Sequence, residues 1–128
     1  MRLYVGGTAQ GKLDYVLEKQ SLSFTEVKVA DGADCIYEEL KNANVINHFH
    51  LWIKREWEKE QDVYVLIEQL LTDNPKVDII CDEVGAGIVP MKREEREYRE
   101  LVGRVSCRLA KEALSVERII CGIGVRIK

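Results

Sequence analysis

A glycine-rich stretch near the amino-terminal end constrains the fold of this chain more than any other feature. It runs from Gly6 to Lys12, follows the apolar run Leu3–Val5 and precedes a helix-patterned segment that starts at Leu13. A strand, a glycine-rich loop and a helix in this order form a cradle in which backbone N–H groups and the helix N-terminus meet phosphate oxygens. The residues predicted to bind nucleotide phosphates are Gly6, Gly7, Thr8, Ala9, Gln10, Gly11 and Lys12, and the lysine is also predicted to act in catalysis.

One residue beyond this loop, the sequence departs from the usual motif. The pattern G-x-x-x-x-G-K-[ST] places a hydroxyl after the lysine to ligate Mg²⁺, and this chain has Leu13 there. The pattern therefore predicts phosphate binding, while Mg²⁺ would have to be held in another way. A glycine-rich turn that binds nothing is the alternative interpretation.

Length and charge limit the classes of protein to which the chain can belong. With 128 residues and a formal net charge of −3, we expect a single P-loop nucleotide-binding domain over residues 1–128. Basic and acidic residues are interleaved without a basic stripe, so nucleic acid is not an expected partner. No apolar stretch approaches the ~20 residues that cross a bilayer, and no signal-peptide pattern follows Met1, so we expect a cytoplasmic protein without a membrane partner.

The four cysteines are spread along the chain without a C-x-x-C pair, as expected of reduced thiols. Cys81 and Cys121 each close an apolar run, where a thiol acts as a small hydrophobic residue. The cysteines therefore give no indication of metal or disulfide chemistry.

Hydrophobic periodicity predicts alternating strands and helices. Phe24–Val29 alternates apolar and polar residues and predicts a peripheral strand, and Val45–Phe49 predicts a third strand that ends near His50. A short helix is expected between them. The pattern is helical from Leu51 onward until Thr72–Pro75 stops it.

The second half of the chain continues this alternation. Val77–Cys81 is typical of a buried parallel strand, and the charged stretch after Pro90 repeats apolar residues every three or four positions up to Ala113, which predicts a long amphipathic helix. Val116–Cys121 and Val125–Ile127 predict one or two closing strands. The whole pattern implies an α/β fold with a mostly parallel central sheet flanked by helices.

Two acids, Asp82 and Glu83, follow the strand predicted at Val77–Cys81. Because the carboxyl ends of parallel strands meet at one edge of a sheet, we expect both acids beside the glycine-rich loop. In phosphate-loop proteins an acid at this place binds Mg²⁺, and a following glutamate polarises the attacking hydroxyl. We therefore assign Asp82 to the metal and Glu83 to catalysis as the base, with an ordinary pair of loop acids as the alternative.

A pair of histidines, His48 and His50, has the spacing H-x-H. On a strand this spacing would place both rings on one face and offer two ligands to zinc, but the sequence indicates no third ligand. Half-exposed or core-edge histidines are the favoured interpretation. The neighbouring Trp52 and Trp57 are interpreted as core or interface anchors.

The segment Asp82–Pro90, D-E-V-G-A-G-I-V-P, resembles the N/D-E-V-G-x-G-I-V-P segment of the adenosylcobinamide kinase/adenosylcobinamide-phosphate guanylyltransferase family. The resemblance continues through Tyr98–Arg99 and Gly103–Val105 to Gly122–Lys128. The loop Gly6–Lys12 also resembles the family's N-terminal loop. On these motifs the chain is similar to a shortened and divergent member of the family.

This resemblance implies a fold, a reaction and partners. Family members have a RecA-like P-loop NTPase fold, phosphorylate the aminopropanol arm of adenosylcobinamide and then attach GMP through a guanylylated histidine, in cobalamin biosynthesis. The resemblance therefore implies ATP or GTP with Mg²⁺ as cofactors, a corrinoid as partner, and self-association into a homo-oligomer.

Three departures from the family's pattern bear on that reaction. The family's loop ends S-G-K-S, whereas Gln10–Leu13 reads Q-G-K-L and lacks both hydroxyls. The stretch Asn47–Trp52, N-H-F-H-L-W, resembles the family's D-C-L-T-L-W and puts Asn47 where a metal-binding aspartate is expected. The family's guanylylated histidine follows the second strand, and here the connection from Val29 to Val45 contains no histidine. Histidine-mediated guanylyl transfer is therefore not expected.

Two hypotheses of function follow. The first is a kinase of this family, in which Lys12 stabilises the phosphates, Asp82 holds Mg²⁺, and Glu83 is the base for a cobinamide-like alcohol. The second is a catalytically degenerate nucleotide- or corrinoid-binding module that acts as a regulator or partner subunit, which Leu13 and Asn47 favour.

Overall fold

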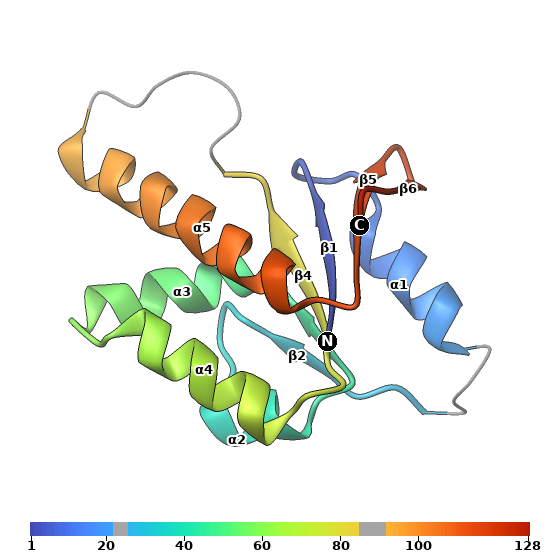
Figure 1. The fold of residues 1–128 in the computed structure, drawn as a ribbon, viewed down its shortest axis with the longest axis horizontal. Helices are drawn as coiled ribbons and strands as arrows, with labels where there is room; N and C mark the ends of the chain where they lie inside the picture. Colours follow the sequence, from blue (N-terminus) through green and yellow to red (C-terminus); the bar gives the residue numbers. More distant parts are fainter. Residues whose placement is uncertain (22–25, 85–91) are drawn as a thin grey trace.

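The computed structural model describes residues 1–21, 26–84 and 92–128. The strands in these residues are β1 (Arg2–Gly6), β2 (Val29–Asp31), β3 (Val45–Asn47), β4 (Asp78–Asp82), β5 (Ser115–Ile120) and β6 (Ile123–Arg126). They form one six-stranded sheet in the order β2-β3-β4-β1-β5-β6 (Figure 1). All neighbouring pairs are parallel except β5 and β6, which are antiparallel. The predicted mostly parallel α/β sheet is thus confirmed.

Helices lie on both faces of this sheet. Their bounds are α1 (Lys12–Ser21), α2 (Tyr37–Asn42), α3 (Phe49–Glu58), α4 (Val63–Asp73) and α5 (Arg93–Glu112). Figure 1 shows α1 on one side of the sheet and α3, α4 and α5 on the other. No helix in the described parts of the chain is long and apolar enough to cross a membrane.

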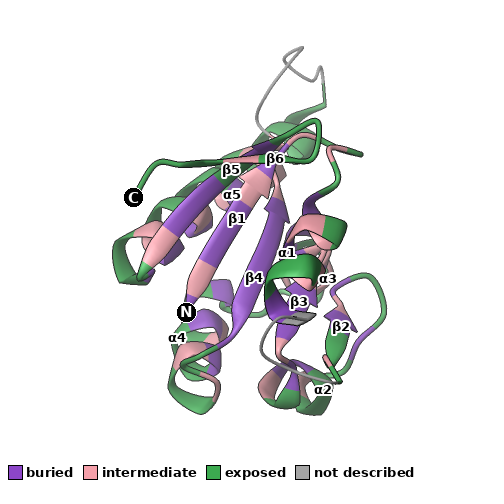
Figure 2. Ribbon diagram, turned by 90° about the vertical axis from the view of Figure 1, so that its right-hand side faces the viewer, coloured by how far each residue is buried: buried purple, intermediate pink, exposed green. Residues whose placement is uncertain are grey.

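The alternation of side chains along the strands divides the core into two clusters. Leu3 and Ile79 belong to the larger cluster, under α3, α4 and α5, whereas their neighbours Tyr4 and Ile80 belong to the smaller cluster under α1. Because successive strand residues point to opposite faces, each central strand supplies both clusters. Figure 2 shows the resulting buried positions along β1 and β4.

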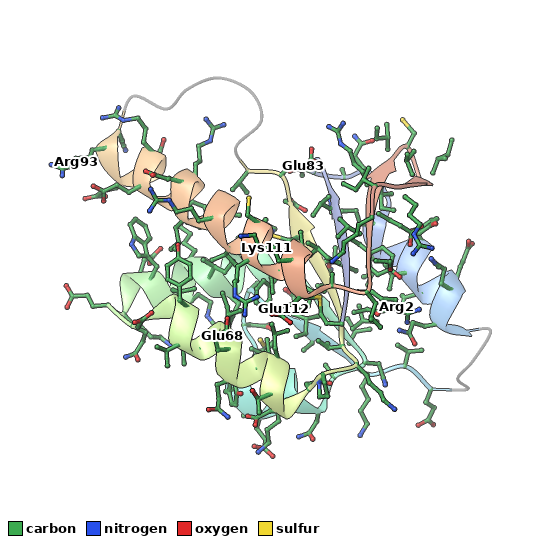
Figure 3. The ribbon with its side chains drawn as sticks, viewed as in Figure 1. Arg2, Glu68, Glu83, Arg93, Lys111 and Glu112 are labelled. Atoms are coloured by element: carbon green, nitrogen blue, oxygen red, sulfur yellow. The ribbon has the colours of Figure 1, made fainter. Side chains whose placement is uncertain are left out.

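The long helix α5 packs as its sequence pattern predicts. Its buried residues, Val102, Val105 and Leu109, recur every three or four positions and form one stripe. On its outer side Arg108 donates to Glu112 of the same helix at 2.9 Å, and it joins α5 to α4 by pairing with Glu68 at 2.7 Å. Figure 3 shows Glu68 and Glu112 on these adjacent helices. Such exposed pairs contribute little free energy, so the apolar stripe holds the helix in place.

Two predicted strands differ from the structure. The second strand was expected at Phe24–Val29, but β2 is Val29–Asp31; residues 24 and 25 lie outside the described residues, and 26–28 form no strand. Its peripheral position is confirmed, because β2 is an edge strand. The third strand was expected to reach Phe49, but β3 ends at Asn47. His48 adopts a left-handed backbone (φ 51°, ψ 45°), which stops the strand and turns the chain into α3.

The helical pattern predicted from Leu51 onward contains two helices. It breaks between α3 and α4, where Glu60 has a left-handed φ of 59°. The side chain of Asp62 then accepts hydrogen bonds from the backbone N–H groups of Tyr64 and Val65, and so caps the start of α4. The predicted stop near residues 72–75 is confirmed, since α4 ends at Asp73.

The cysteines and tryptophans show one further difference from prediction. Cys81 is fully buried in the larger cluster and Trp52 is 2% exposed, as expected. Trp57 packs against this cluster and stacks on Tyr98 with ring centroids 6.0 Å apart. Cys121 is exposed, so the prediction that its thiol acts as a small hydrophobic residue is wrong. It lies after the end of β5, with a left-handed φ of 50°, in the turn to β6.

Candidate functional site at the carboxyl edge of the sheet

The glycine-rich loop connects the end of β1 to the start of α1, as the sequence predicts. Ala9 and Gly11 have left-handed φ angles of 59° and 81°, which curl the backbone back toward the helix start. Gly6 is required by close packing, because a Cβ there would lie 2.5 Å from the backbone oxygen of Ile119. The loop therefore has the local geometry of a phosphate cradle at a helix N-terminus.

The loop lysine and the first of the two acids meet directly. Strand β4 lies beside β1 with Asp82 opposite Gly6, and the Nζ of Lys12 is 2.8 Å from Oδ1 of Asp82. Lys12 also donates to the backbone oxygen of Gly7 at 2.6 Å, and Thr8 donates its hydroxyl to Oδ2 of Asp82 at 3.2 Å. The predicted convergence of the loop and the strand-end acid is confirmed.

Opposing effects act on the ionisation of Asp82. Burial raises its pKa and is the largest single effect, but the hydrogen bond from Lys12, the charges of His50 and Lys12, and the hydroxyl of Thr8 act the other way. Together they hold the pKa of Asp82 below its usual value. Asp82 is therefore a carboxylate at neutral pH, as a residue that meets cations must be.

His50 lies on the other side of Asp82. Its Nδ1 accepts a hydrogen bond from the backbone N–H of Asp82 at 3.2 Å, and its Nε2 is 3.6 Å from Oδ2 of the same residue. Because a backbone N–H can only donate, Nδ1 carries no proton and the ring proton is on Nε2, on the side of the carboxylate. Burial lowers the pKa of His50, the charges of His48 and Lys12 lower it further, and Asp82 opposes them.

The second acid has a different environment. Both oxygens of Glu83 accept from Arg118 on β5, at 2.9 and 3.1 Å, and its backbone N–H donates to the oxygen of Gly6. Figure 3 shows Glu83 at the carboxyl end of β4. The prediction that Glu83 lies at the carboxyl edge of the sheet is confirmed. Glu83 is not, however, among the residues that line the pocket around the loop.

That pocket has a volume of about 190 Å³, which is several times the share of one water molecule in the liquid. Its lining residues are Thr8, Ala9, Gln10, Gly11, Lys12, Leu13, Asp14, Asn47, His48 and Asp82. Most of the predicted phosphate-binding residues therefore line one cavity together with the strand ends of β3 and β4.

The turn between β5 and β6 holds the glycine-rich loop in place through two hydrogen bonds, a contact called the brace below. Gln10 accepts hydrogen bonds from two residues of this turn: its backbone oxygen from Gly122 at 2.7 Å, and its side-chain oxygen from Cys121 at 2.8 Å. The two segments lie more than a hundred residues apart in the sequence. Sequence reasoning missed this brace, because nothing local in either segment indicates the other.

The H-x-H pair is not arranged as the zinc hypothesis requires. His48 sits in the turn before α3 and His50 within its first turn, so the two do not share a strand face. Nδ1 of His48 is 3.0 Å from Oδ1 of Asp31, while His50 faces Asp82. Among the described residues, no group of three His, Cys, Asp or Glu could hold a metal ion. Sequence reasoning missed the contact between His50 and Asp82, although both follow neighbouring strand ends.

The fold and this loop geometry define the chain as an α/β protein of the P-loop class. A family model described as "Cobinamide kinase / cobinamide phosphate guanyltransferase" matches residues 16–127, which is most of the chain, and the chain belongs to this family. The matched range begins after the glycine-rich loop. The remainder of the motif resembling the family, residues 85–90, lies outside the described residues.

Two curated relatives carry the same printed description, "Bifunctional adenosylcobalamin biosynthesis protein CobU". The relative from Salmonella typhimurium strain LT2 is 41% identical over 69 residues, covering 54% of this chain and 38% of the relative. The relative from Escherichia coli strain K12 is 47% identical over 53 residues, covering 41% of this chain and 29% of the relative. The matched part of the chain thus spans well under half the length of these relatives.

Proposed function

We propose that this chain is a kinase that transfers the terminal phosphoryl group of ATP or GTP to the hydroxyl of a cobinamide-like alcohol in cobalamin biosynthesis. The observation that carries the proposal is the 2.8 Å pairing of Lys12 with Asp82 in a pocket lined by the glycine-rich loop. Membership of the cobinamide kinase family supports the choice of acceptor. The comparisons give no support to the degenerate-module hypothesis.

In this proposal the loop binds the phosphates and its lysine exchanges partners. Lys12 is held by Asp82 and Gly7, and a bound phosphate would compete with both for its ammonium group. Loop N–H groups at the start of α1 add fixed partial charge, which is the main way in which proteins catalyse phosphoryl transfer. The acceptor oxygen forms a bond to the terminal phosphorus, the bond to the bridging oxygen of the nucleoside diphosphate breaks, and Glu83 accepts the hydroxyl proton.

Glu83 can act as a base while it is paired with Arg118. Arg118 donates one hydrogen bond to each carboxylate oxygen, and each oxygen keeps a second lone pair that can accept the hydroxyl proton. Both residues are partly exposed, with 26% of the Glu83 side chain and 50% of the Arg118 side chain accessible. Exchange of such a pair with water costs little.

The pocket also offers ligands that suit Mg²⁺. This ion prefers oxygen donors and is usually held by one or two carboxylates together with phosphates and waters. Asp82, the hydroxyl of Thr8 and the amide of Asn47 supply oxygens at the pocket wall, whereas Leu13 supplies none. When bound, Mg²⁺ would neutralise charge on the transferring phosphates.

A kinase step, rather than guanylyl transfer, is proposed because each histidine near the pocket is already engaged. His50 is 7% exposed and contacts Asp82 through both ring nitrogens, and His48 is paired with Asp31. Incubation with labelled GTP checks this point directly. Acid-labile label on either histidine would restore guanylyl transfer to this chain.

Thermal denaturation with ATP or GTP, with and without Mg²⁺, tests the nucleotide site. A ligand at about a hundred times its Kd should stabilise the protein by about 2.7 kcal/mol. We expect this stabilisation for the wild type, and loss of most of it in Lys12→Ala. Lys19→Ala is the matched control, because Lys19 lies on the same helix and also pairs with a carboxylate, that of Glu117, away from the pocket.

The same preparations then test turnover. With adenosylcobinamide as acceptor, Glu83→Gln should keep the nucleotide-dependent stabilisation and lose at least about 10²-fold in kcat. Turnover equal to that of the wild type would remove Glu83 from the mechanism. A wild-type protein that neither binds nucleotide nor phosphorylates the acceptor would overturn the proposed function.

A further inference from the structure

A second cavity lies beside the phosphate pocket, on the side of the sheet that α5 covers. It has a volume of about 460 Å³ and is larger than the phosphate pocket. Its lining residues come from the ends of β1 and β4 and from the middle of α5: Val5, Asp82, Glu83, Val84, Val102, Gly103 and Ser106. Nothing in the mechanism above uses most of this space.

The two cavities share one wall. Asp82 lines both, and Val5 in the second cavity lies three residues before Thr8 in the first. A molecule in the second cavity would therefore lie beside Asp82, which also lines the phosphate pocket. This is the relation that a phosphoryl acceptor must have to its donor, because the two reacting oxygens approach the same phosphorus from opposite sides.

The chemistry of the walls selects among ligands. Val5, Val84 and Val102 provide an apolar surface, and the polar groups are two carboxylates and the hydroxyl of Ser106. None of the described residues that line this cavity is basic, but Lys12 and Arg118 pair with its two carboxylates, and Arg99 donates to the backbone oxygen of Val84 at 2.6 Å. These pairs leave the polar wall close to neutral, so the three valines favour a molecule that buries a hydrocarbon chain against them.

We propose that this second cavity is the acceptor site, and that it holds the hydrocarbon arm of an alcohol with its hydroxyl directed to the Asp82–Glu83 wall. The inference rests on the proposed kinase function and names where its second substrate binds. Glu83, at the wall, is then placed to take the hydroxyl proton as the oxygen joins the terminal phosphorus. The nucleoside diphosphate leaves on the side of Lys12.

Gly103 offers a way to fill the cavity without disturbing the fold. It lies within α5, and a Cβ built on it meets no atom within 4 Å. A larger side chain there enters open space at the cavity wall. Glycine inside a helix is also about 1 kcal/mol less favourable than alanine, so replacing it should not destabilise α5.

The experiment measures acceptor and nucleotide separately in Gly103→Leu. We expect KM for adenosylcobinamide, and its Kd measured by the absorbance of the corrinoid, to rise at least about tenfold. The nucleotide-dependent thermal stabilisation should match that of the wild type. Gly103→Ala adds only a methyl group and should show a much smaller effect, and Cys107→Leu adds bulk at an exposed position of α5 outside the lining residues.

The outcomes separate this inference from the function on which it rests. If the wild type phosphorylates adenosylcobinamide and Gly103→Leu does so with the same KM and Kd as Cys107→Leu, the acceptor lies elsewhere while the kinase proposal stands. If the wild type binds adenosylcobinamide without phosphorylating it, and Gly103→Leu weakens that binding, the site stands and the kinase proposal fails. A wild type that neither binds nor phosphorylates the corrinoid overturns both.

Discussion

Strand β4 begins and ends with an aspartate, and the two aspartates have different surroundings. Asp78 and Asp82 lie four residues apart, so their side chains share a face of the sheet. Each pairs with a cation at 2.7–2.8 Å, Asp78 with Arg2 and Asp82 with Lys12. Figure 3 shows Arg2 and Glu83 at opposite ends of the strands. The same residue type on the same strand therefore stands in two environments.

The difference lies in what surrounds each carboxylate. Asp78 is fully buried and accepts two hydrogen bonds from Arg2 and one from Gln20, at 2.6–2.9 Å. Asp82 is bonded to Lys12 and Thr8, and both of these line an open pocket. A carboxylate that is itself fully buried, as Asp78 is, stabilises the fold, while one that lines a cavity together with its partners can exchange them for a ligand. Cavity position, rather than ion pairing itself, distinguishes the two.

The largest expected effect is on turnover in Asp82→Asn. Loss of this charge removes the proposed metal ligand and the partner of Lys12, and we expect kcat to fall about 10²- to 10³-fold. Lys12 is only 7% exposed, but it keeps its hydrogen bond to Gly7 and the amide oxygen of the variant can still accept from it, so the free energy of unfolding should fall by about 1–2 kcal/mol. Steady-state kinetics and urea denaturation measure the two quantities. A large loss of stability with unchanged kcat would assign Asp82 to the fold and remove the contrast with Asp78.

At the other end of β4, Asp78→Asn should lower the stability of the fold and leave kcat almost unchanged. Asp78→Asn places an amide NH₂ against Arg2 and Gln20, so one buried donor loses its acceptor. Since 42% of the Arg2 side chain is accessible and can be hydrated, we expect a loss of about 2–3 kcal/mol in the free energy of unfolding. The kcat of the folded variant should stay within about threefold of the wild type. An unfolding midpoint in urea equal to that of the wild type would show that Asp78 is not a structural ion pair.

The sequence predicts those parts of the site that depend on local pattern and on the geometry of a parallel sheet. The loop Gly6–Lys12 was found from its glycines between two periodic segments. The meeting of Lys12 with Asp82 followed from parallel strands having their carboxyl ends at one edge. The long apolar stripe of α5 gave that helix its position. Each of these features follows either from a strong hydrophobic periodicity or from the rule that parallel strands end at the same edge of a sheet.

The remaining features depend on contacts that local pattern does not contain. β2 and β3 have three residues each, too few for an alternation to fix their bounds. The end of β3 depends on the left-handed backbone of His48. The pattern of Val45–Phe49 is that of a strand and gives no sign of this turn. Arg118 reaches Glu83 from a strand that follows 35 residues later in the sequence. Asp62 before α4 is the exception, because a capping residue there was a readable signal for the missed helix boundary.

The smallest expected effect is a pH dependence that belongs to the Asp82 end alone. Burial lowers the pKa of His50 in the folded protein below its ordinary value of 6.5. As pH falls through about 6.5, the unfolded chain binds a proton that folded His50 does not, so the free energy of unfolding falls with it. The same direction follows from geometry, since a protonated Nδ1 could no longer accept from the N–H of Asp82. Asp82, whose pKa is also lowered from 3.8, loses its contribution only at more acidic pH.

Urea denaturation between pH 7 and 5.5 measures this slope. His50→Asn retains an acceptor near the Nδ1 position but does not titrate, so its free energy of unfolding should vary less with pH than that of the wild type. The contacts described for Asp78, with Arg2, Gln20 and the backbone oxygen of Asn44, include no histidine. Asp78→Asn should therefore lower the stability by the same amount throughout this range. A slope that persists in His50→Asn and disappears in His48→Asn would move the pH response to the pair of His48 with Asp31, away from β4.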